Sequence, residues 1–217
     1  MVEEPSRDCP RCPRLAAFRA EHRAAYPDWH NAPVSSFGPI DAPLLIVGLA
    51  PGMRGANRTG RPFTGDYAGD LLYSTLLDLG FAQGHYRADP GDGLFLKECR
   101  ITNAVRCLPP QNKPTGKEIT ECRPFLLGEL TCLPNLKAVV VLGRIAHESV
   151  LRALGERQVQ FPFSHGAMHP VGRLTLLDSY HCSRYNTQTG RLTGPMFRQV
   201  FEQVRELLAG DRPPSMP

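Results

Sequence analysis

The sequence predicts an α/β fold: a single three-layer α/β/α domain around a central, mostly parallel, four-stranded sheet. Two observations lead to this prediction. Short apolar runs alternate along the chain with segments of helical apolar spacing, which is typical of α/β domains. Residues 137–142 (KAVVVL) are almost continuously β-branched, as expected of a strand that helices cover on both faces. With 217 residues, of which 41% are hydrophobic, the chain is long enough for one well-packed core.

The first half of the chain is predicted to contain two helices and two strands. Residues 14–26 have helix composition, and residues 43–49 form an apolar run typical of a buried strand. Residues 67–79 have helical apolar spacing, and residues 100–105 are a second strand candidate.

The second half continues the alternation. Thr115-x-x-Glu118 is a capping-box pattern, which predicts a helix running from Thr115 towards Cys132. After the strand at residues 137–142, Gly143 leads into a helix at residues 144–154. Residues 174–177 are the fourth predicted strand, and residues 195–208 are an amphipathic helix. We expect residues 1–209 to form the domain and the proline-rich residues 210–217 to form a flexible tail.

Composition narrows the class of protein. Lys and Arg exceed Asp and Glu by 4, a mild surplus that suits an anionic partner without requiring one. No apolar run approaches the roughly 20 residues of a membrane span, and residues 1–13 lack the apolar core of a signal peptide. We therefore expect a cytoplasmic protein without membrane contact. Its seven cysteines are expected to be thiols or metal ligands rather than disulfides.

A glycine-rich loop, residues 48–66 (GLAPGMRGANRTGRPFTGD), follows the first strand. It holds five glycines, two prolines and three arginines, so ordering it is costly. In parallel sheets, ligands bind where loops leave the carboxyl ends of strands, so we expect this loop to bind a ligand. It has neither the Gly-Lys-Ser/Thr of a P-loop nor the spacing of a dinucleotide fingerprint, which weakens the case for a nucleotide-binding enzyme.

Four cysteines suggest a metal centre. Cys9 and Cys12 form a C-x-x-C pair, Cys107 follows the second strand, and Cys122 lies fourteen intervening residues further on. Four thiolates suit zinc or a four-iron cluster, and the alternative is that Cys107 and Cys122 are small buried side chains and the pair is incidental. The remaining three cysteines are not needed for such a site: Cys99, Cys132 and Cys182, with Cys132 the first substitute ligand.

A polar loop is predicted after the fourth strand, at residues 178–187 (DSYHCSRYNT). A lone histidine after a strand, such as His181, is more often a structural hydrogen-bonding group than a catalytic one. Here serine, arginine, tyrosine and asparagine lie within a few residues of it, at the edge of the sheet where a ligand is expected. This loop is therefore a second candidate part of the binding site.

Together these motifs resemble the uracil-DNA glycosylase superfamily, in its iron–sulfur bacterial and archaeal branches. The resemblance rests on GLAPG with GRPFTGD, on Ile101-Thr102-Asn103 followed by Cys107-Leu108-Pro109-Pro110, and on His181-x-Ser183, and it spans residues 9 to about 194. Leu49 and Ala50 stand where other branches carry an acid, and Cys182 stands where they carry proline. These departures resemble family five, also called type B, which is known for a broader range of deaminated bases.

The resemblance implies an enzyme, a cofactor and a partner. The enzyme is a monomeric, monofunctional DNA glycosylase of base excision repair, and its partner is single- or double-stranded DNA that contains uracil or another deaminated base. The cofactor is a [4Fe–4S] cluster on Cys9, Cys12, Cys107 and Cys122. The implied substrate-binding residues are Leu49, Ala50, Pro51, Gly52, Phe63, Asn103 and His181.

The chemistry of base removal suits these residues. The reaction passes through an oxocarbenium-like sugar while negative charge accumulates on the departing base, so hydrogen-bond donors aimed at the base lower the barrier. The base must first leave the duplex. Phe63 offers a stacking face, Asn103 an amide that reads the base edge, and His181 a donor to the base carbonyl. The alternatives are that Phe63 is a core aromatic and Asn103 a turn former.

No acid occupies the first motif, so the residue that orients the attacking water must lie elsewhere. Asp66 and Asp70 are the candidates. We predict that Asp66 is the catalytic acid because it directly follows the segment expected to face the base, whereas Asp70 fits the first turn of the next helix. A dissociative path that relies on the substrate's phosphates and on His181 would need no acid.

DNA is expected to be held through its phosphates by the glycine-rich loop and by the loop after the fourth strand. Arg184 or Tyr185 is expected to fill the space that the flipped base leaves. The predicted DNA-binding residues are Arg54, Gly55, Arg58, Arg61, Ser183, Arg184 and Tyr185. The alternative function is that of a non-catalytic iron–sulfur or zinc protein that binds nucleic acid with the same loops.

Overall fold

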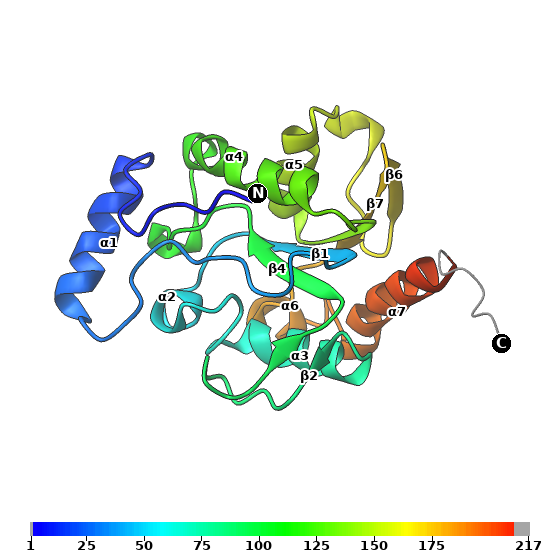
Figure 1. Ribbon diagram of the computed structural model, residues 1–217, viewed down its shortest axis with the longest axis horizontal. Coiled ribbons are helices and arrows are strands. Elements are labelled where there is room, and N and C mark those ends of the chain that lie inside the picture. The colour runs from blue at the N-terminus through cyan, green and yellow to red at the C-terminus, as the bar shows by residue number, and fades with distance from the viewer. Residues whose placement is uncertain (1, 211–217) are drawn as a thin grey trace.

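The computed structural model describes residues 2–210 and contains a five-stranded sheet between helices (Figure 1). The order of strands is β4-β1-β5-β7-β6, in which the first four are parallel and β6 is antiparallel to β7. Two further short strands pair with each other in a separate antiparallel ribbon. The strands of the sheet are β1 (Leu44–Gly48), β4 (Cys99–Asn103), β5 (Ala138–Leu142), β6 (Met168–Val171) and β7 (Leu174–Ser179), and those of the ribbon are β2 (Ala82–Gln83) and β3 (Phe95–Leu96).

Helices cover both faces of the sheet. In Figure 1, α4 (Gly116–Cys132) and α5 (Arg144–Leu154) lie above it, and α3 (Tyr67–Asp78) and α7 (Gly194–Gly210) lie below it. Helix α1 (Pro13–Ala25) lies to one side. The short elements are α2 (Ala56–Thr59), α6 (Arg184–Gln188) and two 3₁₀ turns, η1 (Pro110–Asn112) and η2 (Gln158–Gln160).

Successive residues of the central strands face opposite helical layers. Leu45 and Val139 pack with α4 and α5, whereas Ile46 and Val140 pack with α3 and α7. Every residue of β1 and β5 is buried. This explains the continuous apolar runs, since a strand covered on both faces has no polar side.

The structure confirms the α/β class and the mostly parallel sheet, with element ends shifted by one or two residues. The capping box of α4 forms as predicted, with both Thr115 and Glu118 bonding to backbone N–H groups. The predicted number of four strands is wrong, because β6 adds an antiparallel fifth strand at the edge. Its sequence contains Pro170, which cannot donate to a ladder and is tolerated at a sheet edge.

The predicted tail begins at Gly210, which instead is the last residue of α7, and the rest of the predicted tail, residues 211–217, lies outside the described residues. Among residues 2–210, no helix is long and apolar enough to cross a membrane.

A buried ion-pair network joins the N-terminal segment to the sheet. Arg106 and Glu129 are almost fully buried, and Arg106 Nη2 lies 3.3 Å from Glu129 Oε1. Glu4 reaches the other side of the same guanidinium, with Oε2 3.0 Å from Arg106 Nη1. Arg100 Nε also bonds to Glu129 Oε2 at 2.7 Å. The network fixes the segment that precedes the first cysteine pair against β4 and α4.

Candidate active site

A cavity of about 580 Å³ lies where β1, β4 and β7 end. The parallel register places the last residue of β1, Gly48, beside the last residue of β4, Asn103. Strand β7 ends two residues before His181. The cavity therefore lies at the carboxyl edge of the sheet, where open α/β sheets bind ligands. All seven predicted substrate-binding residues line it: Leu49, Ala50, Pro51, Gly52, Phe63, Asn103 and His181.

Asn103 presents an unpaired amide oxygen. The residue is 3% exposed, and its Oδ1 has no hydrogen-bond partner among the described residues. A side chain on Gly48 would collide with this oxygen and with the Phe63 ring, so glycine at this position lets both groups approach. A buried, unpaired acceptor costs stability unless a ligand satisfies it. Asn103 is thus ready to accept a hydrogen bond from a bound molecule.

Phe63 has an unusual backbone conformation. Its φ of 52° lies in the left-handed region, which is rare for a bulky residue and costs free energy. The ring is buried, and its centroid lies 6.1 Å from that of His181 with an interplanar angle of 30°. The strained backbone therefore holds an aromatic face in the cavity beside the histidine.

His181 is a neutral imidazole at pH 7. Burial lowers its pKa to about 4, and its Cβ packs against Gly143, at the turn before α5. A neutral imidazole has one N–H, which can donate to an oxygen that gains negative charge.

Asp66 faces the cavity and Asp70 does not. Asp66 is the N-cap of α3, and its Oδ1 accepts from the Gly69 N–H at 3.2 Å. The carboxylate lies against Gly55, where any side chain would collide with it. Burial raises the pKa of Asp66. Asp70 is exposed in the first turn of α3 and is not part of the cavity wall.

Four of the seven predicted DNA-binding residues line the same cavity: Arg54, Gly55, Ser183 and Arg184. Ser183 also caps α6 by accepting from the Asn186 N–H. Tyr185 follows on α6 and is 73% exposed. Arg58 lies beyond Gly55 on α2 and lines a separate polar groove with Trp29 and His30.

The prediction that Arg61 contacts phosphate is wrong for this structure. Arg61 is buried, and its two terminal nitrogens each lie 2.8 Å from a carboxylate oxygen of Asp92, which is itself buried. Its Nε donates to Thr64 at 2.7 Å. These bonds hold the pKa of Asp92 far below its usual range. Arg61 therefore supports the glycine-rich loop from inside, and its burial and its ion pair with Asp92 keep it from contacting a DNA phosphate.

Five other residues complete the cavity wall, and the motifs did not single them out. They are Met53, Ala56, Tyr67, Ala68 and Asn112. Asn112 comes from the 3₁₀ turn after Pro109, where Gln111 and Asn112 both have positive φ values of 54° and 56°. The only sequence signal for this turn is the pair of prolines, which predicts a turn but not its direction.

The four predicted metal ligands, Cys9, Cys12, Cys107 and Cys122, line one small cavity between α1 and α4. The Arg106 N–H donates to Cys122 Sγ at 3.3 Å, and Arg19 Nη1 lies 3.6 Å from Cys107 Sγ. Burial, and after it the neighbouring Cys122, raise the pKa of Cys12 to about 11. The donor set is thus four convergent thiols with N–H groups directed at two of them.

These sulfurs are not gathered as closely as the ligands of a single bound ion. Among the described residues, no three cysteine sulfurs lie within 4.8 Å of one another. A zinc ion with Zn–S bonds of about 2.3 Å would hold four sulfurs closer, at about 3.8 Å. The other cysteines lie elsewhere: Cys99 and Cys182 are buried in the core, and Cys132 is exposed at the end of α4.

The sequence matches the family described as the uracil DNA glycosylase superfamily over residues 35–205. It is 47% identical to a type-5 uracil-DNA glycosylase of Thermus thermophilus, over 92% of this chain and 93% of that protein. It is 37% identical to a type-5 uracil-DNA glycosylase of Pyrobaculum aerophilum, over 91% and 88% of the two chains. A type-4 uracil-DNA glycosylase of the same organism is 28% identical, over 96% and 92%.

Proposed function

Since this chain belongs to the uracil-DNA glycosylase superfamily, in its type-5 branch, we propose that it excises uracil from DNA by hydrolysing the N-glycosidic bond. It is then a hydrolase of base excision repair. The observation that carries the proposal is the unpaired, buried oxygen of Asn103 in a cavity that also holds Phe63 and His181. A flipped uracil offers what this cavity lacks: a flat face for Phe63 and an N–H for Asn103.

In the proposed reaction, the C1′–N1 bond breaks and its electron pair leaves with the base. The neutral His181 donates its N–H to the carbonyl oxygen on which this negative charge accumulates. A neutral donor suits this role. A neutral imidazole needs no charged partner of its own, so its N–H can donate directly to the anion as it forms. Water then forms the new bond to C1′ and gives up a proton, and solvent protonates the released base.

Asp66 is the proposed acid of the site. Its carboxylate faces the same cavity and can orient the attacking water or balance the positive charge of the sugar. Leu49 and Ala50, which stand in the first motif, also line the cavity and cannot perform this role. The backbone N–H groups of residues 49–52 are further candidates for contacts with the substrate.

DNA is proposed to lie across the rim formed by the glycine-rich loop and α6. Arg54 and Arg184 flank the cavity and suit phosphate contacts, and the exposed Tyr185 suits insertion beside the flipped base. Arg58 can extend the contact to the far side of α2. We further propose that the protein acts as a single-domain monomer in the cytoplasm, where reducing conditions keep its thiols free.

The cofactor proposed for the four-cysteine cavity is a [4Fe–4S] cluster. A cluster binds each thiolate to a different iron, which suits sulfurs spaced more widely than a single zinc ion allows. When bound, it supplies a structural crosslink between the N-terminal segment and α4. The two N–H donors to sulfur favour the thiolate form that such a cluster needs.

Iron analysis tests the cofactor proposal. Protein purified without oxygen should be brown and contain about four irons. Cys12→Ser should lose the iron, whereas Cys132→Ser, a cysteine outside the cavity, should retain it. One equivalent of zinc and no iron in the purified protein would contradict the proposal.

Release of free uracil from a labelled duplex tests the proposed function itself. Under single turnover, the protein should release uracil from a single dU site and leave an abasic strand that breaks only after alkali treatment. An identical duplex with thymine at that site should remain intact. Tight binding of the uracil duplex without any release would instead favour the non-catalytic nucleic-acid-binding function.

We also propose that the substrate range exceeds uracil. Leu49 and Ala50 stand in place of acids in the cavity wall, so this part of the wall is less polar and can admit hypoxanthine or bulky pyrimidines. Asn103→Ala should reduce uracil release much more than hypoxanthine release, because the two bases present different edges. A lesion panel with activity on uracil alone would contradict this proposal.

A further inference from the structure

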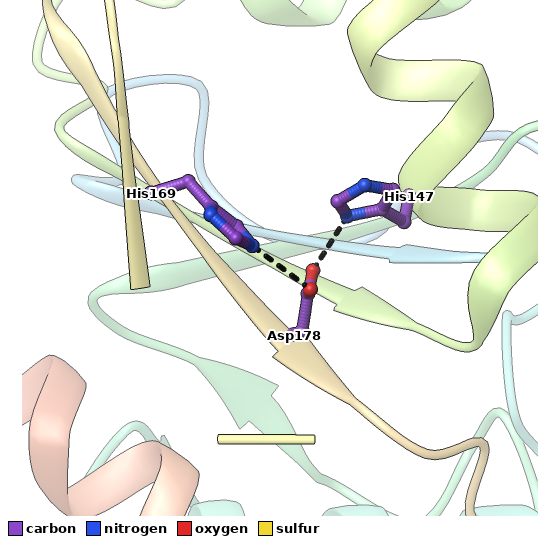
Figure 2. A group of neighbouring side chains, drawn as sticks. All are labelled: His147, His169 and Asp178. Atoms are coloured by element: carbon purple, nitrogen blue, oxygen red, sulfur yellow. Dashed lines mark hydrogen bonds and ion pairs between the residues drawn. The ribbon is translucent and has the colours of Figure 1, made fainter. Parts of the chain in front are cut away.

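A second group of titratable side chains lies outside the cavity, between the sheet and α5. Figure 2 shows the Asp178 carboxylate of β7 between His147 of α5 and His169 of β6. His147 Nδ1 lies 2.6 Å from Asp178 Oδ1, and His169 Nε2 lies 3.1 Å from Asp178 Oδ2. His147 and Asp178 are almost completely buried.

The protein satisfies this group without an ion. The three ligand atoms lie within 4.8 Å of one another, as metal ligands would. However, Asp178 Oδ2 also accepts from the Ser164 N–H at 3.1 Å, and His147 Nε2 bonds to the Phe161 carbonyl at 2.8 Å. Both nitrogens of His147 and both oxygens of Asp178 thus have partners, which is typical of a structural hydrogen-bond network.

The same network encloses the backbone that leads to His181. The Gly166 N–H donates to the Asp178 carbonyl at 2.8 Å, and the Tyr180 N–H donates to His165 Nδ1 at 3.1 Å. The rings of His165 and Tyr180 stack with centroids 5.0 Å apart. Each residue from Asp178 to Tyr180 is therefore fixed just before the chain reaches His181.

On its other side, His181 contacts the start of α5. The Gly143 N–H donates to the Ser179 carbonyl at 2.7 Å, and the His181 Cβ packs on Gly143. His147 lies one turn along α5 and ties this helix to Asp178. The end of β7 and the start of α5, which determine where His181 lies, are thus joined by the Gly143–Ser179 backbone bond and by the buried His147–Asp178 bond.

We propose that His147, Asp178 and His165 are positioning residues for His181. They hold the end of β7, the start of α5 and the loop at residues 161–167 in one arrangement, which aims the imidazole of His181 at the departing base. The inference rests on the proposed function, since it assigns these residues to the step that His181 performs. None of the three lines the cavity, so they act only through His181.

His165→Phe is the main test variant. It keeps the stacking on Tyr180 but removes the acceptor of the Tyr180 N–H, and its partly exposed site makes loss of folding a small risk. We expect the single-turnover rate of uracil release to fall about tenfold with DNA affinity unchanged. His147→Gln, which disturbs the buried end of the network, should have the same effect. The matched control is His22→Gln. His22 is a buried histidine of α1 that bonds to the Phe18 carbonyl, and its variant should keep the wild-type rate.

A double-mutant cycle separates positioning from general destabilisation. In a His181→Ala background, adding His165→Phe should lower the rate less than twofold, because the group being positioned is already missing. Losses that multiply in the double variant would overturn the proposal, and so would a tenfold loss of DNA affinity in the single variant.

A second readout does not depend on activity. The ¹⁵N NMR signals of the His181 imidazole should shift in both His165→Phe and His147→Gln and stay unchanged in His22→Gln. Unchanged His181 signals in both network variants would overturn the positioning role. If the wild-type protein releases no uracil, the proposed function fails, whereas the NMR comparison still decides whether the network positions His181.

Discussion

His181 contributes to one step only, because its N–H meets negative charge that exists in the transition state and not in the bound duplex. We predict that His181→Ala lowers the single-turnover rate of uracil release by about 10² to 10³-fold. DNA affinity, measured by fluorescence anisotropy on an uncleavable analogue, should change little. A variant that retains the full rate would show that leaving-group stabilisation comes from another group.

The burial of His181 also has a consequence for stability. Its pKa is about 4 in the folded protein, below the ordinary value of 6.5, so between these pH values the unfolded chain binds a proton that the folded protein does not. Stability is therefore lost as pH falls from 6.5 towards 4. We predict that the melting temperature of His181→Asn falls less than that of the wild type between pH 7.5 and 5.0. Exposed His85 provides the control, since His85→Asn should follow the wild type. Parallel losses in all three proteins would contradict the prediction.

The two acids at the start of α3 can be separated by matched amide substitutions. Asp66→Asn keeps the shape of the side chain and its cap on α3 but removes the charge that faces the cavity. We predict an appreciable loss of single-turnover rate for Asp66→Asn and a smaller loss for the exposed Asp70→Asn. If Asp66→Asn retained the wild-type rate and Asp70→Asn lost most of it, the assignment of the acid would be wrong.

At the scale of elements, the glycine-rich loop determines where the Asp66 carboxylate can lie. A methyl group at Gly55 would collide with this carboxylate. We predict that Gly55→Ala lowers the rate at least tenfold, because Asp66 must leave its position, while the protein remains folded by circular dichroism. Gly116→Ala is the matched control, since a methyl group there, at the first residue of α4, meets no atom within 4 Å. Equal rates for the two variants would contradict the proposed contact between loop and acid.

The elements that the sequence predicted share a local signal. The composition of residues 137–142 indicates a buried strand. Thr115 and Glu118 indicate the start of α4, because their side chains bond within a single turn. Strand β6 has no such signal, because what makes Met168–Val171 a strand is the free edge of β7 beside it. Its pairing is a property of the assembled sheet.

The residues of the site also divide into those with a local sequence signal and those placed by distant contacts. The placement of Asn103 and His181 in the cavity could be predicted because each ends or closely follows a recognisable strand, and that of Phe63 because it lies in the GRPFTGD motif. The burial of Arg61 could not, because its partner Asp92 lies thirty-one positions away in a segment without a motif. The position of Asn112 could not be predicted for a related reason. Two consecutive residues with positive φ direct it into the cavity, and the conformational preference of Gln111 does not indicate such a turn.

At the scale of the whole molecule, the buried pair of Arg106 and Glu129 joins the N-terminal segment, the sheet and α4. Removing the charge of Glu129 leaves the buried guanidinium of Arg106 with one carboxylate partner, the partly exposed Glu4. We predict that Glu129→Gln lowers the free energy of unfolding by about 3 kcal/mol. Glu202→Gln, which breaks an exposed pair with Arg198 on α7, should cost less than about 1 kcal/mol. Urea unfolding of both variants measures the difference, and similar midpoints would contradict it.

The central place of β1 has a consequence for the newly synthesised chain. Leu44 leaves the ribosome long before Cys99 and Ala138, the residues with which it pairs on either side. Until both arrive, β1 exposes two unsatisfied edges and an apolar surface, which is the state most prone to association with other chains. Pairings so distant in sequence also slow folding. The yield of native protein should therefore depend on the rate of translation and on chaperones that shield this strand, more than on the final stability of the sheet.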